Sequence, residues 1–558
     1  GIGTLYTAAE IHALITRVQE GGLVVNGTLS SPNGVQVANG AFLGGSGMVY
    51  GNVTIHGTLA PGNSPGTLTI VGDYFQGADG TLDLEIAGKD HFDRLTVTGV
   101  ATLGGKLNVI PYQGYQLEYG QKFTFLAASK IQGAFDSIVL PSGLRGRLLT
   151  KNNKATLLVA PESYTQVAAT PNHHNVAKAL DAFIGGRGDR DRVSLALDEL
   201  KPGEHARAFH QIAPTYYESL ATLTLEQSNA QGQMLQQRFG AVRFGGIGSR
   251  GFSQSGLSLP VVAEKSAKTT KDIMEVSAEN PWGVWIQGNG IFAKISGVGD
   301  LGSYDTDSGG FLLGADYRWN AAFTTGFYAG YQSTNSDLDN GNRTSINAAR
   351  FGAYATFDAG NGFYANALVG GGYSDYTVRR TIEFGNLSRV ARSNPQGGEF
   401  TAMLGGGYDW QVGGFVLGPV ASLQYTYANI NRFAERGANS LNLLLDEQEA
   451  HSLRSVLGAR LAYTWLAKQD VAITPEVRVS WQHEFLNGSR TLQAALDAGS
   501  GPNFGYTTLS PSRNALSAAA GLNFQFGPRW SANLYYNLNA GRGDYRSHMV
   551  SGGVNFSF

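Results

Sequence analysis

The sequence predicts an all-β protein: a parallel β-helix stem with a C-terminal cap, a short helical linker, and a twelve-stranded antiparallel transmembrane β-barrel with a helix in its lumen. Three observations support this prediction. Residues 282–558 hold about twelve segments in which apolar and polar residues alternate. The connections between these segments alternate in length, and the chain ends on the aromatic Phe558. Short strands that recur from Gly22 onward predict the β-helix.

The alternation in the second half is typical of strands with one face in lipid. In segments such as Phe323–Tyr331 and Leu453–Tyr463, successive side chains point to opposite faces, so one row can be apolar and the other polar. About 10 residues, tilted by about 45°, cross a bilayer. We expect strands at 282–293, 309–319, 322–337, 344–358, 362–380, 399–411, 415–431, 451–466, 470–486, 514–527, 529–541 and 545–558.

The connections give this barrel an orientation. Those after even-numbered strands are tight, whereas most of those after odd-numbered strands are long and polar, at 294–308, 381–398, 432–450 and 487–513. Outer-membrane barrels have short periplasmic turns and longer external loops. A soluble β-sandwich is the alternative for alternating strands, but it needs neither this alternation of loops nor an aromatic end.

The first half predicts a β-helix. Gly22–Leu29 returns as Val53–Leu59, and Gly66-Thr-Leu68 echoes the same pattern. Rungs of this kind bury their apolar side only by stacking, so the stem, residues 1–72, needs a cap at its end. Within the stem, apolar residues at helical spacing predict a short helix over Ala8–Val18.

Helical patterns occupy the middle of the chain. A linker at 161–214 is expected to hold three short helices, at His173–Ile184, Arg192–Leu200 and Glu204–Ile212. Residues 215–244 predict one longer helix of roughly 40 Å, too polar to face lipid but suited to a polar lumen. The alternative for this helix is an external position packed on the stem. Residues 245–281 are interpreted as a flexible periplasmic connector.

Several segments resemble the autotransporters of type V secretion. The opening Trp282-Gly-Val-Trp285, the run Gly309–Asp316 and the terminal Phe558 resemble the translocator domain, and the likeness covers the whole second half. Leu59–Leu68 is similar to the C-terminal stem of the exported passengers of this family, and the resemblance implies that a capping region follows it, here at 73–160. The segment that contains Leu235, Arg238, Phe239 and Arg243 resembles the foot of the pore helix, although the insert 244–281 is absent from shorter family members.

The resemblance implies a translocator in the bacterial outer membrane that exports its own N-terminal passenger and anchors it, with residues 1–160 at the cell surface. It implies a signal for the barrel-assembly machinery in Phe558, Phe556 and Val554. Outer-membrane lipid, lipopolysaccharide and periplasmic chaperones are the other expected partners of a monomer. The chain begins at Gly1 without a leader, so we interpret it as a fragment or a processed form.

Two other functions stay open. The β-helix itself could act as a surface adhesin that binds a host or its matrix, or an upstream hydrolase or protease could be the cargo. For adhesion the candidates are two integrin-type tripeptides, Arg187, Gly188 and Asp189, and Arg542, Gly543 and Asp544, although Gly-Asp is also ordinary turn chemistry. Some family members cut their pore helix at an Asn, and Asn229 is the only Asn here, but we do not predict cleavage.

Composition and local motifs predict neither an enzyme nor a cofactor. The net charge of −2 argues against a nucleic-acid partner, and the absence of cysteine fits export through an oxidising periplasm. Gly62–Gly66 matches G-x-S-x-G, and Gly297–Gly302 matches G-x-G-x-x-G, but neither has the required helix after it. His173-His174 point apart on a helix, and Asp300, Asp305 and Asp307 are expected to form a solvated external loop.

Overall fold

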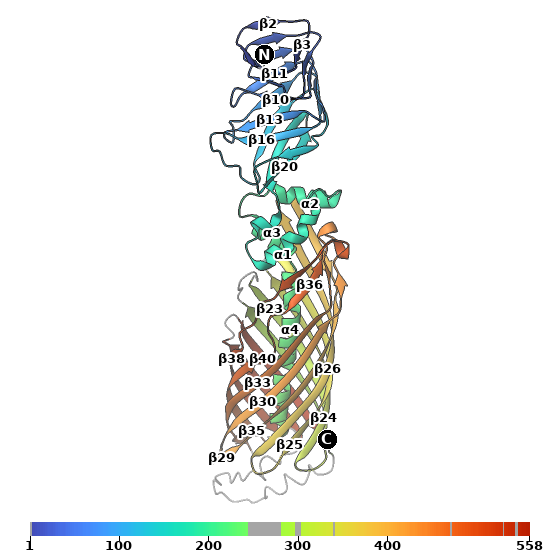
Figure 1. Cartoon of the computed structure of the whole chain (residues 1–558). Coiled ribbons are helices and arrows are strands. Elements are labelled where there is room, and N and C mark those ends of the chain that lie inside the picture. The colour runs from blue at the N-terminus through green and yellow to red at the C-terminus, as the bar shows by residue number, and fades with distance from the viewer. Residues whose placement is uncertain are drawn as a thin grey trace, which may run out of the picture. The chain divides into compact units, whose positions relative to one another are not determined.

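The computed structural model describes residues 3–243, 281–295, 303–338, 341–468, 471–527, 529–541 and 545–558, with Leu466 and Lys468 described by their backbone alone. Contacts divide the chain into two units. One holds residues Gly1–Phe209 with Glu383–Leu387, and the other holds His210–Ile382 with Ser388–Phe558. Figure 1 labels their elements.

Three parallel sheets form the stem, in the orders β1-β4-β7-β10-β13-β16-β19, β2-β5-β8-β11-β14-β17 and β18-β15-β12-β9-β6-β3. Two of the Gly-Thr-Leu repeats supply Leu59 and Leu82, which stack with Leu23, Leu43 and Leu107 in one ladder inside the coil. All five are buried. The stem strands are β1 Thr4–Thr7, β2 Glu10–His12, β3 Thr16–Val18, β4 Gly22–Val25, β5 Thr28–Ser30, β6 Val35–Val37, β7 Phe42–Gly45, β8 Met48–Tyr50, β9 Val53–Ile55, β10 Thr58–Pro61, β11 Thr67–Val71, β12 Tyr74–Gln76, β13 Thr81–Ile86, β14 Arg94–Val97, β15 Val100–Leu103, β16 Lys106–Pro111, β17 Lys122–Ala127, β18 Lys130–Gly133 and β19 Ser137–Val139.

The prediction of a helix over Ala8–Val18 is wrong. This segment forms β2 and β3, the first rung of the coil, where Ile11 pairs with Leu29 and Val18 with Val37. The segment forms strands because the next rung offers its backbone and its apolar side chains partners that an isolated helix lacks. The parallel ladders also run on past residue 72, as far as β19.

The end of the coil is closed by antiparallel strands and helices. β21 (Lys154–Pro161) pairs antiparallel with both β17 and β20 (Leu144–Lys151). The carboxylate of Asp198 is fully buried and accepts hydrogen bonds from Arg145, Arg147 and Tyr164. The linker elements are η1 Tyr164–Val167, α1 Pro171–Leu180, η2 Asp181–Phe183, α2 Asp189–Asp198 and α3 His205–Ile212, so the linker holds the three helices that the sequence predicts.

Asp93 gives the stem an expected dependence on pH. Its carboxylate accepts hydrogen bonds from the amides of Gly66 and Glu85, and burial raises its pKa to about 6. Between about pH 4 and 6, folded chains hold a proton that unfolded chains release, so folding gains stability as pH falls through this window. We expect β13 and β14 amides to be better protected at pH 5 than at pH 7 in hydrogen exchange corrected for intrinsic rates. Equal protection at both values would contradict this account.

The second unit is a closed antiparallel barrel. Its strands follow the order β25-β24-β23-β22-β40-β39-β38-β35-β33-β30-β28-β26, and β26 pairs back onto β25, so each of these 12 strands has two neighbours. Every ladder between them is antiparallel. The strands are β22 Trp282–Ile295, β23 Tyr304–Arg318, β24 Phe323–Leu338, β25 Asn342–Asp358, β26 Phe363–Phe384, β28 Gln396–Tyr408, β30 Phe415–Ile430, β33 Gln448–Tyr463, β35 Val471–Glu484, β38 Asn514–Phe526, β39 Trp530–Ala540 and β40 Tyr545–Ser557, with short strands β29 Trp410–Val412 and β34 Trp465–Lys468 beside them.

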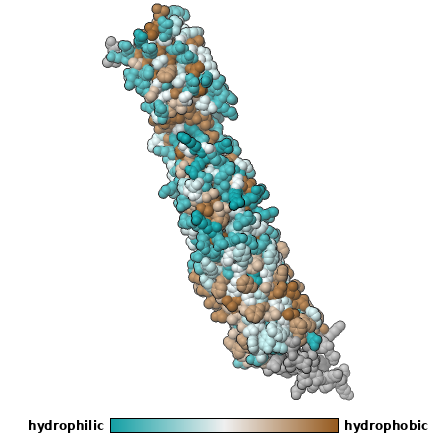
Figure 2. Space-filling model, turned by 90° about the vertical axis from the view of Figure 1, so that its right-hand side faces the viewer, coloured by the Kyte–Doolittle hydropathy of each residue, from teal (hydrophilic) through white to brown (hydrophobic). Residues whose placement is uncertain are grey.

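The outer wall of this barrel is apolar. Phe327, Phe351 and Leu404 are each about two-thirds exposed, as expected of side chains that meet lipid. Aromatic pairs such as Trp282 with Tyr317 and Trp530 with Phe556 lie at the ends of strands next to the short turns, where a membrane interface favours them. Figure 2 shows brown side chains gathered on part of the barrel surface. None of the helices in the described part of the chain is both long and apolar enough to cross a membrane.

The long connections are more ordered than the sequence predicts. Most of the expected loop 381–398 continues β26 and returns as β27 (Leu387–Ser393). The expected loops 432–450 and 487–513 together build a four-stranded sheet in the order β31-β32-β36-β37. Its elements are β31 Phe433–Ala434, η7 Asn439–Leu441, β32 Leu444–Leu445, β36 Thr491–Ala495, η8 Asp497–Gly499 and β37 Asn503–Thr507. Polar composition alone did not reveal the joined sheet, because β32 pairs with β36 from the other loop.

Candidate functional site: the helix in the barrel lumen

A single long helix fills the lumen. α4 spans Glu218–Ala241 and follows the short η3 helix, Thr215–Tyr217. Most of its residues are buried, although the sequence is rich in Gln, Ser and Thr. Its partners are inward-facing side chains of barrel strands, so the alternative of an external helix packed on the stem is excluded. A polar helix can be buried in this position because the lumen supplies hydrogen-bond partners.

The middle of α4 is held by hydroxyls and one ion pair. The Thr224 and Tyr376 hydroxyls lie 2.8 Å apart, and those of Ser228 and Thr401 lie 2.6 Å apart. Arg350 donates to the Gln227 side-chain oxygen at 2.9 Å and is paired with Glu399. These bonds reach β25, β26 and β28, so one side of the helix is tied to neighbouring strands.

The foot of α4 carries a buried ion pair. Arg238 donates both to Asp316 on β23 and to Asn555 on β40. Tyr354 on β25 also donates to Asp316, and the Tyr354 hydroxyl in turn accepts from the Trp285 indole at 2.9 Å. Arg238 is 2% exposed and Asp316 is fully buried, so each charge depends on the other for its solvation.

Apolar packing surrounds this ion pair. Leu235 and Phe239 are buried with Met234 in one cluster, against Trp285, Leu312, Tyr328, Tyr354, Leu368 and Met403. The ring centroids of Phe239 and Tyr354 lie 5.5 Å apart. Arg243 lies beyond the end of α4 with its guanidinium 3.2 Å from the Tyr364 ring centroid. The structure therefore brings Leu235, Arg238 and Phe239 together and places Arg243 at a separate contact.

At the other end of α4, external connections hold the chain. The Tyr217 hydroxyl is buried and donates to Glu435 at 2.7 Å. Arg380, also fully buried, forms a bidentate pair with Glu435 and donates to the carbonyls of Gln211 and Ile212. The chain entering α4 is thus fixed to the ends of strands and loops on the side opposite the short turns.

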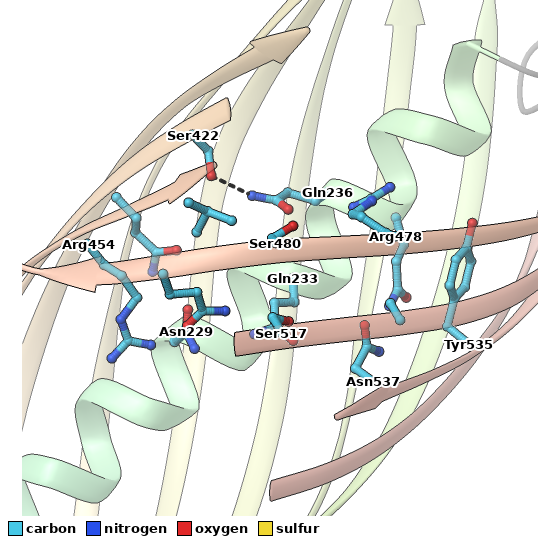
Figure 3. Close-up of a pocket in the computed structure, with 15 residues that line it drawn as sticks. Asn229, Gln233, Gln236, Ser422, Arg454, Arg478, Ser480, Ser517, Tyr535 and Asn537 are labelled. Atoms are coloured by element: carbon cyan, nitrogen blue, oxygen red, sulfur yellow. Dashed lines mark hydrogen bonds between the residues drawn. The ribbon is translucent and has the colours of Figure 1, made fainter. Parts of the chain in front are cut away.

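The helix is seated asymmetrically. The apolar cluster ties it to β22–β26 and β28, and polar side chains tie it to β30 and β33, whereas a polar cleft lies between it and β35, β38 and β39. Figure 3 shows this cleft, where Gln236 donates to Ser422 at 3.0 Å and Arg454 and Arg478 enter from the wall. Each arginine has a carboxylate partner, Glu226 for Arg454 and Glu476 for Arg478. The cleft is lined by Asn229, Gln233, Gln236, Gln237, Ser422, Gln424, Arg454, Val456, Arg478, Ser480, Gln482, Ser517, Ala519, Tyr535 and Asn537.

Val554 and Phe556 of the expected assembly signal lie on the last strand and Phe558 directly follows it, at the seam where the barrel closes. Phe556 pairs with Val284 and Val554 with Ile286 of the first strand. Phe558 donates its amide to the Trp282 carbonyl at 3.2 Å, and its ring lies 5.1 Å from that of Phe556. Val554 and Phe558 are exposed on the outer wall.

The other predicted motifs lie in different parts of the chain. Arg187 and Gly188 precede α2, which begins at Asp189, whereas Arg542, Gly543 and Asp544 lie outside the described residues. Gly62–Gly66 forms the turn between β10 and β11. His173 is buried beside Phe209, and no group of three or more metal-ligating side chains occurs in the described ranges.

The acidic loop prediction needs correction. Asp305 and Asp307 do not lie in a loop, because both belong to β23 and face outward next to β22. Asp300, the Gly297–Gly302 motif and nearly all of the connector 245–281 lie outside the described residues. The strand extends farther than expected because Asp305 pairs with Lys294, a cross-strand contact that offsets the poor strand propensity of Asp.

Sequence reasoning missed the partners of the pore helix. Four of these partners are charged or amide residues at inward positions of barrel strands: Asp316, Arg350, Glu399 and Asn555. Their inward register was available from the alternation of apolar residues around them. A charged residue on the polar row of a predicted barrel strand is the signal that could have found them.

The barrel matches a known family. Residues 284–537 match the family model described as "Autotransporter beta-domain". An extracellular serine protease of Serratia marcescens is 25% identical over 531 residues, which is 87% of this chain and 49% of that protein. Esterase EstA of Pseudomonas aeruginosa is 25% identical over 304 residues, 51% of this chain and 46% of that protein. The chain thus spans about half the length of these curated relatives.

Among solved structures, the translocator domain of autotransporter NalP from Neisseria meningitidis is similar at a TM-score of 0.41 and 16% identity. That alignment covers 60% of this chain and 98% of the other. The transport unit of autotransporter AIDA-I from Escherichia coli is similar at a TM-score of 0.37 and 13% identity, with 56% and 99% covered.

Proposed function

We propose that this chain, whose residues 284–537 match the autotransporter β-domain, is an autotransporter whose outer-membrane barrel exports the N-terminal part of its own chain and anchors it at the cell surface. One observation carries the proposal: the chain itself occupies the pore. Tyr217 is bound beside the long connections, whereas Arg238 and Phe239 are bound near the opposite end, where β22 begins. Residues before α4 therefore leave the lumen on the side of the long loops.

The proposed mechanism is physical. A closed ring of strands satisfies its own backbone hydrogen bonds in lipid and leaves a lumen that a chain can cross. The passenger crosses unfolded, and folding of the stem outside makes the step directional without ATP. α4 then remains as the plug. Each stem rung buries its apolar side against a neighbouring rung, and this burial supplies the free energy that makes export directional.

An epitope in the stem tests the export. The turn at 88–91, between β13 and β14, is exposed enough to carry a short tag in a chain fused to a secretion leader. Antibody should label intact cells, and added protease should remove the tag without lysis. A matched chain with the same tag in the short turn 359–362 should be labelled only after the outer membrane is opened. Labelling of both tags on intact cells would contradict the orientation.

Removing Phe558 should reduce the amount of folded barrel in the outer membrane to a small fraction. The truncation deletes the aromatic end and the hydrogen bond to Trp282 at the closing seam. Heat-modifiable migration in gels measures the folded fraction. Phe558→Leu keeps the backbone bond and part of the apolar side chain, so it should retain more folded barrel. Normal assembly of the truncated chain would argue against a signal at this end.

The relatives favour one identity for the cargo. An extracellular protease and an esterase, each about twice the matched length, support a hydrolase as the passenger carried by this translocator. The stem described here would then act as its stalk. The sequence that precedes residue 1 in the gene tests this directly, since a hydrolase motif there is expected and further β-helix rungs alone would favour an adhesin.

A further inference from the structure

The polar cleft beside α4 exists because one strand of the barrel wall carries small inward side chains. On β38 the inward residues that line the cleft are Ser517 and Ala519. Ala519 is directly opposite two larger residues of the neighbouring strands, Arg478 on β35 and Asn537 on β39. Both of these side chains line the cleft from the wall, and Gln236 lines it from α4 (Figure 3). The methyl group of Ala519 therefore leaves room between a guanidinium and an amide.

The buried atoms of the cleft that lack a hydrogen bond are all donors. Among the described residues that line it, four buried side-chain atoms make no hydrogen bond: Gln237 Nε2, Arg454 Nε, Arg478 Nε and Asn537 Nδ2. Gln237 is 3% exposed and Asn537 is 5% exposed. The side-chain oxygen of Gln237 accepts from Gln287 and Ser551, so its NH₂ group is the part that is left over. Buried N–H groups of this kind call for an acceptor.

Positive charge is in excess around Arg478. Arg478 pairs with Glu476 at 2.7 Å, and Arg460, directly opposite Arg478 on β33, pairs with Asp409 at 3.5 Å. Arg243 lines an adjoining pocket together with Arg478. These five side chains are three cations and two anions, which leaves one positive charge over. In a lumen with a low dielectric constant, that charge attracts an anion more strongly than it does in water.

An anion suits these groups better than water does. A water molecule accepts hydrogen bonds but also brings two O–H donors, which need acceptors of their own, whereas an anion only accepts. We propose that the cleft binds a small inorganic anion such as chloride above Ala519, held by N–H groups of Arg478 and Asn537 from the wall and of Gln237 from α4. The anion links α4 to β35, β38 and β39, the strands that the apolar cluster does not reach. This site goes beyond the proposed function, because it requires only a folded barrel with α4 in its lumen.

Chlorine NMR on the full chain, folded in detergent, tests the site. The resonance of free chloride broadens when the ion exchanges with a site on a large particle, and we expect a saturable broadening for wild type. Ala519→Leu fills the space between Arg478 and Asn537 and removes no charge, so the saturable broadening should be lost. Arg478→Gln should lose it as well, because it removes the cation. Asn537→Leu serves as a third variant that keeps the ion pair with Glu476 and removes one donor.

Arg529→Gln is the matched control, because Arg529 is an exposed arginine beside a short turn. It should broaden the line as wild type does. Heat-modifiable migration shows which variants are folded, and only those are compared. Release of chloride by millimolar phosphate would assign the site to a tetrahedral oxyanion, and retention would assign it to chloride.

Three results would overturn the proposal. They are a wild-type line without saturable broadening, broadening that persists in a folded cleft variant, and release of chloride by gluconate, which is too large for the cleft. Because binding is measured on folded barrel, a failure of the export experiment does not change this result.

Discussion

A barrel that begins at residue 242, and so lacks α4, should conduct roughly tenfold more ionic current than one that begins at residue 210. The reason is the occupancy of the lumen. A helix with its side chains is about 10–12 Å across, which is most of the space inside a barrel of this strand number. With α4 present, the described residues leave ions only polar clefts beside the helix, such as the one at Gln236 and Arg454 and the one at Glu226 and Ala293. Single-channel recording in planar bilayers measures both forms.

The two chains differ by the helix and the residues that lead into it. Heat-modifiable migration must show that both barrels are folded before their currents are compared. A third chain, beginning at residue 210 with Tyr217→Phe, loses the hydrogen bond to Glu435 at the top of α4 and should show brief openings to the larger conductance. Equal conductance with and without α4 would mean that the helix does not close the pore in the membrane.

The barrel was predictable because lipid restricts it so strongly. Every lipid-facing position must be apolar and every strand needs two partners, so alternation and loop length together carry the topology. The polar character of α4 was equally informative, since a helix of that length without an apolar face has few places to be buried. These constraints act on residue types, which can be read directly from a sequence.

Which segments and side chains pair with one another was harder to predict from the sequence. The segment Ala8–Val18 has apolar residues that fit a helix as well as a rung, and only the neighbouring rung at Leu29 and Val37 decides between them. The small sheet β31-β32-β36-β37 joins two distant loops, so local patterns in either loop do not reveal it. The pairing of Arg238 with Asp316 likewise depends on the rotation of α4 in the lumen, which its nearly uniform polarity leaves open.

That pairing leads to the second large effect. Arg238→Ala should destabilise the seated helix by about 3–5 kcal/mol, because it leaves the buried carboxylate of Asp316 without its cation and Asn555 without its donor. The midpoint of the heat-modifiable gel shift and urea unfolding in detergent measure the loss. Gln236→Ala, two residues earlier and facing the cleft, removes the bond to Ser422 and a weak one to the Met403 sulfur, and should cost about 1 kcal/mol.

A double-mutant cycle separates the ion pair from the packing around it. Asp316→Leu alone leaves the guanidinium of Arg238 unpaired, and Arg238→Met alone leaves the carboxylate of Asp316 unpaired. The two substitutions together remove both charges and keep apolar volume near Trp285 and Phe239. The double variant should therefore be more stable than either single variant, because the desolvation penalty of a lone buried charge disappears. If the losses of the two single variants simply added, the two residues would not interact, and the helix foot would be held by its apolar cluster alone. A coupling of several kcal/mol would instead make Arg238 and Asp316 the contact that fixes the rotation of α4 in the pore.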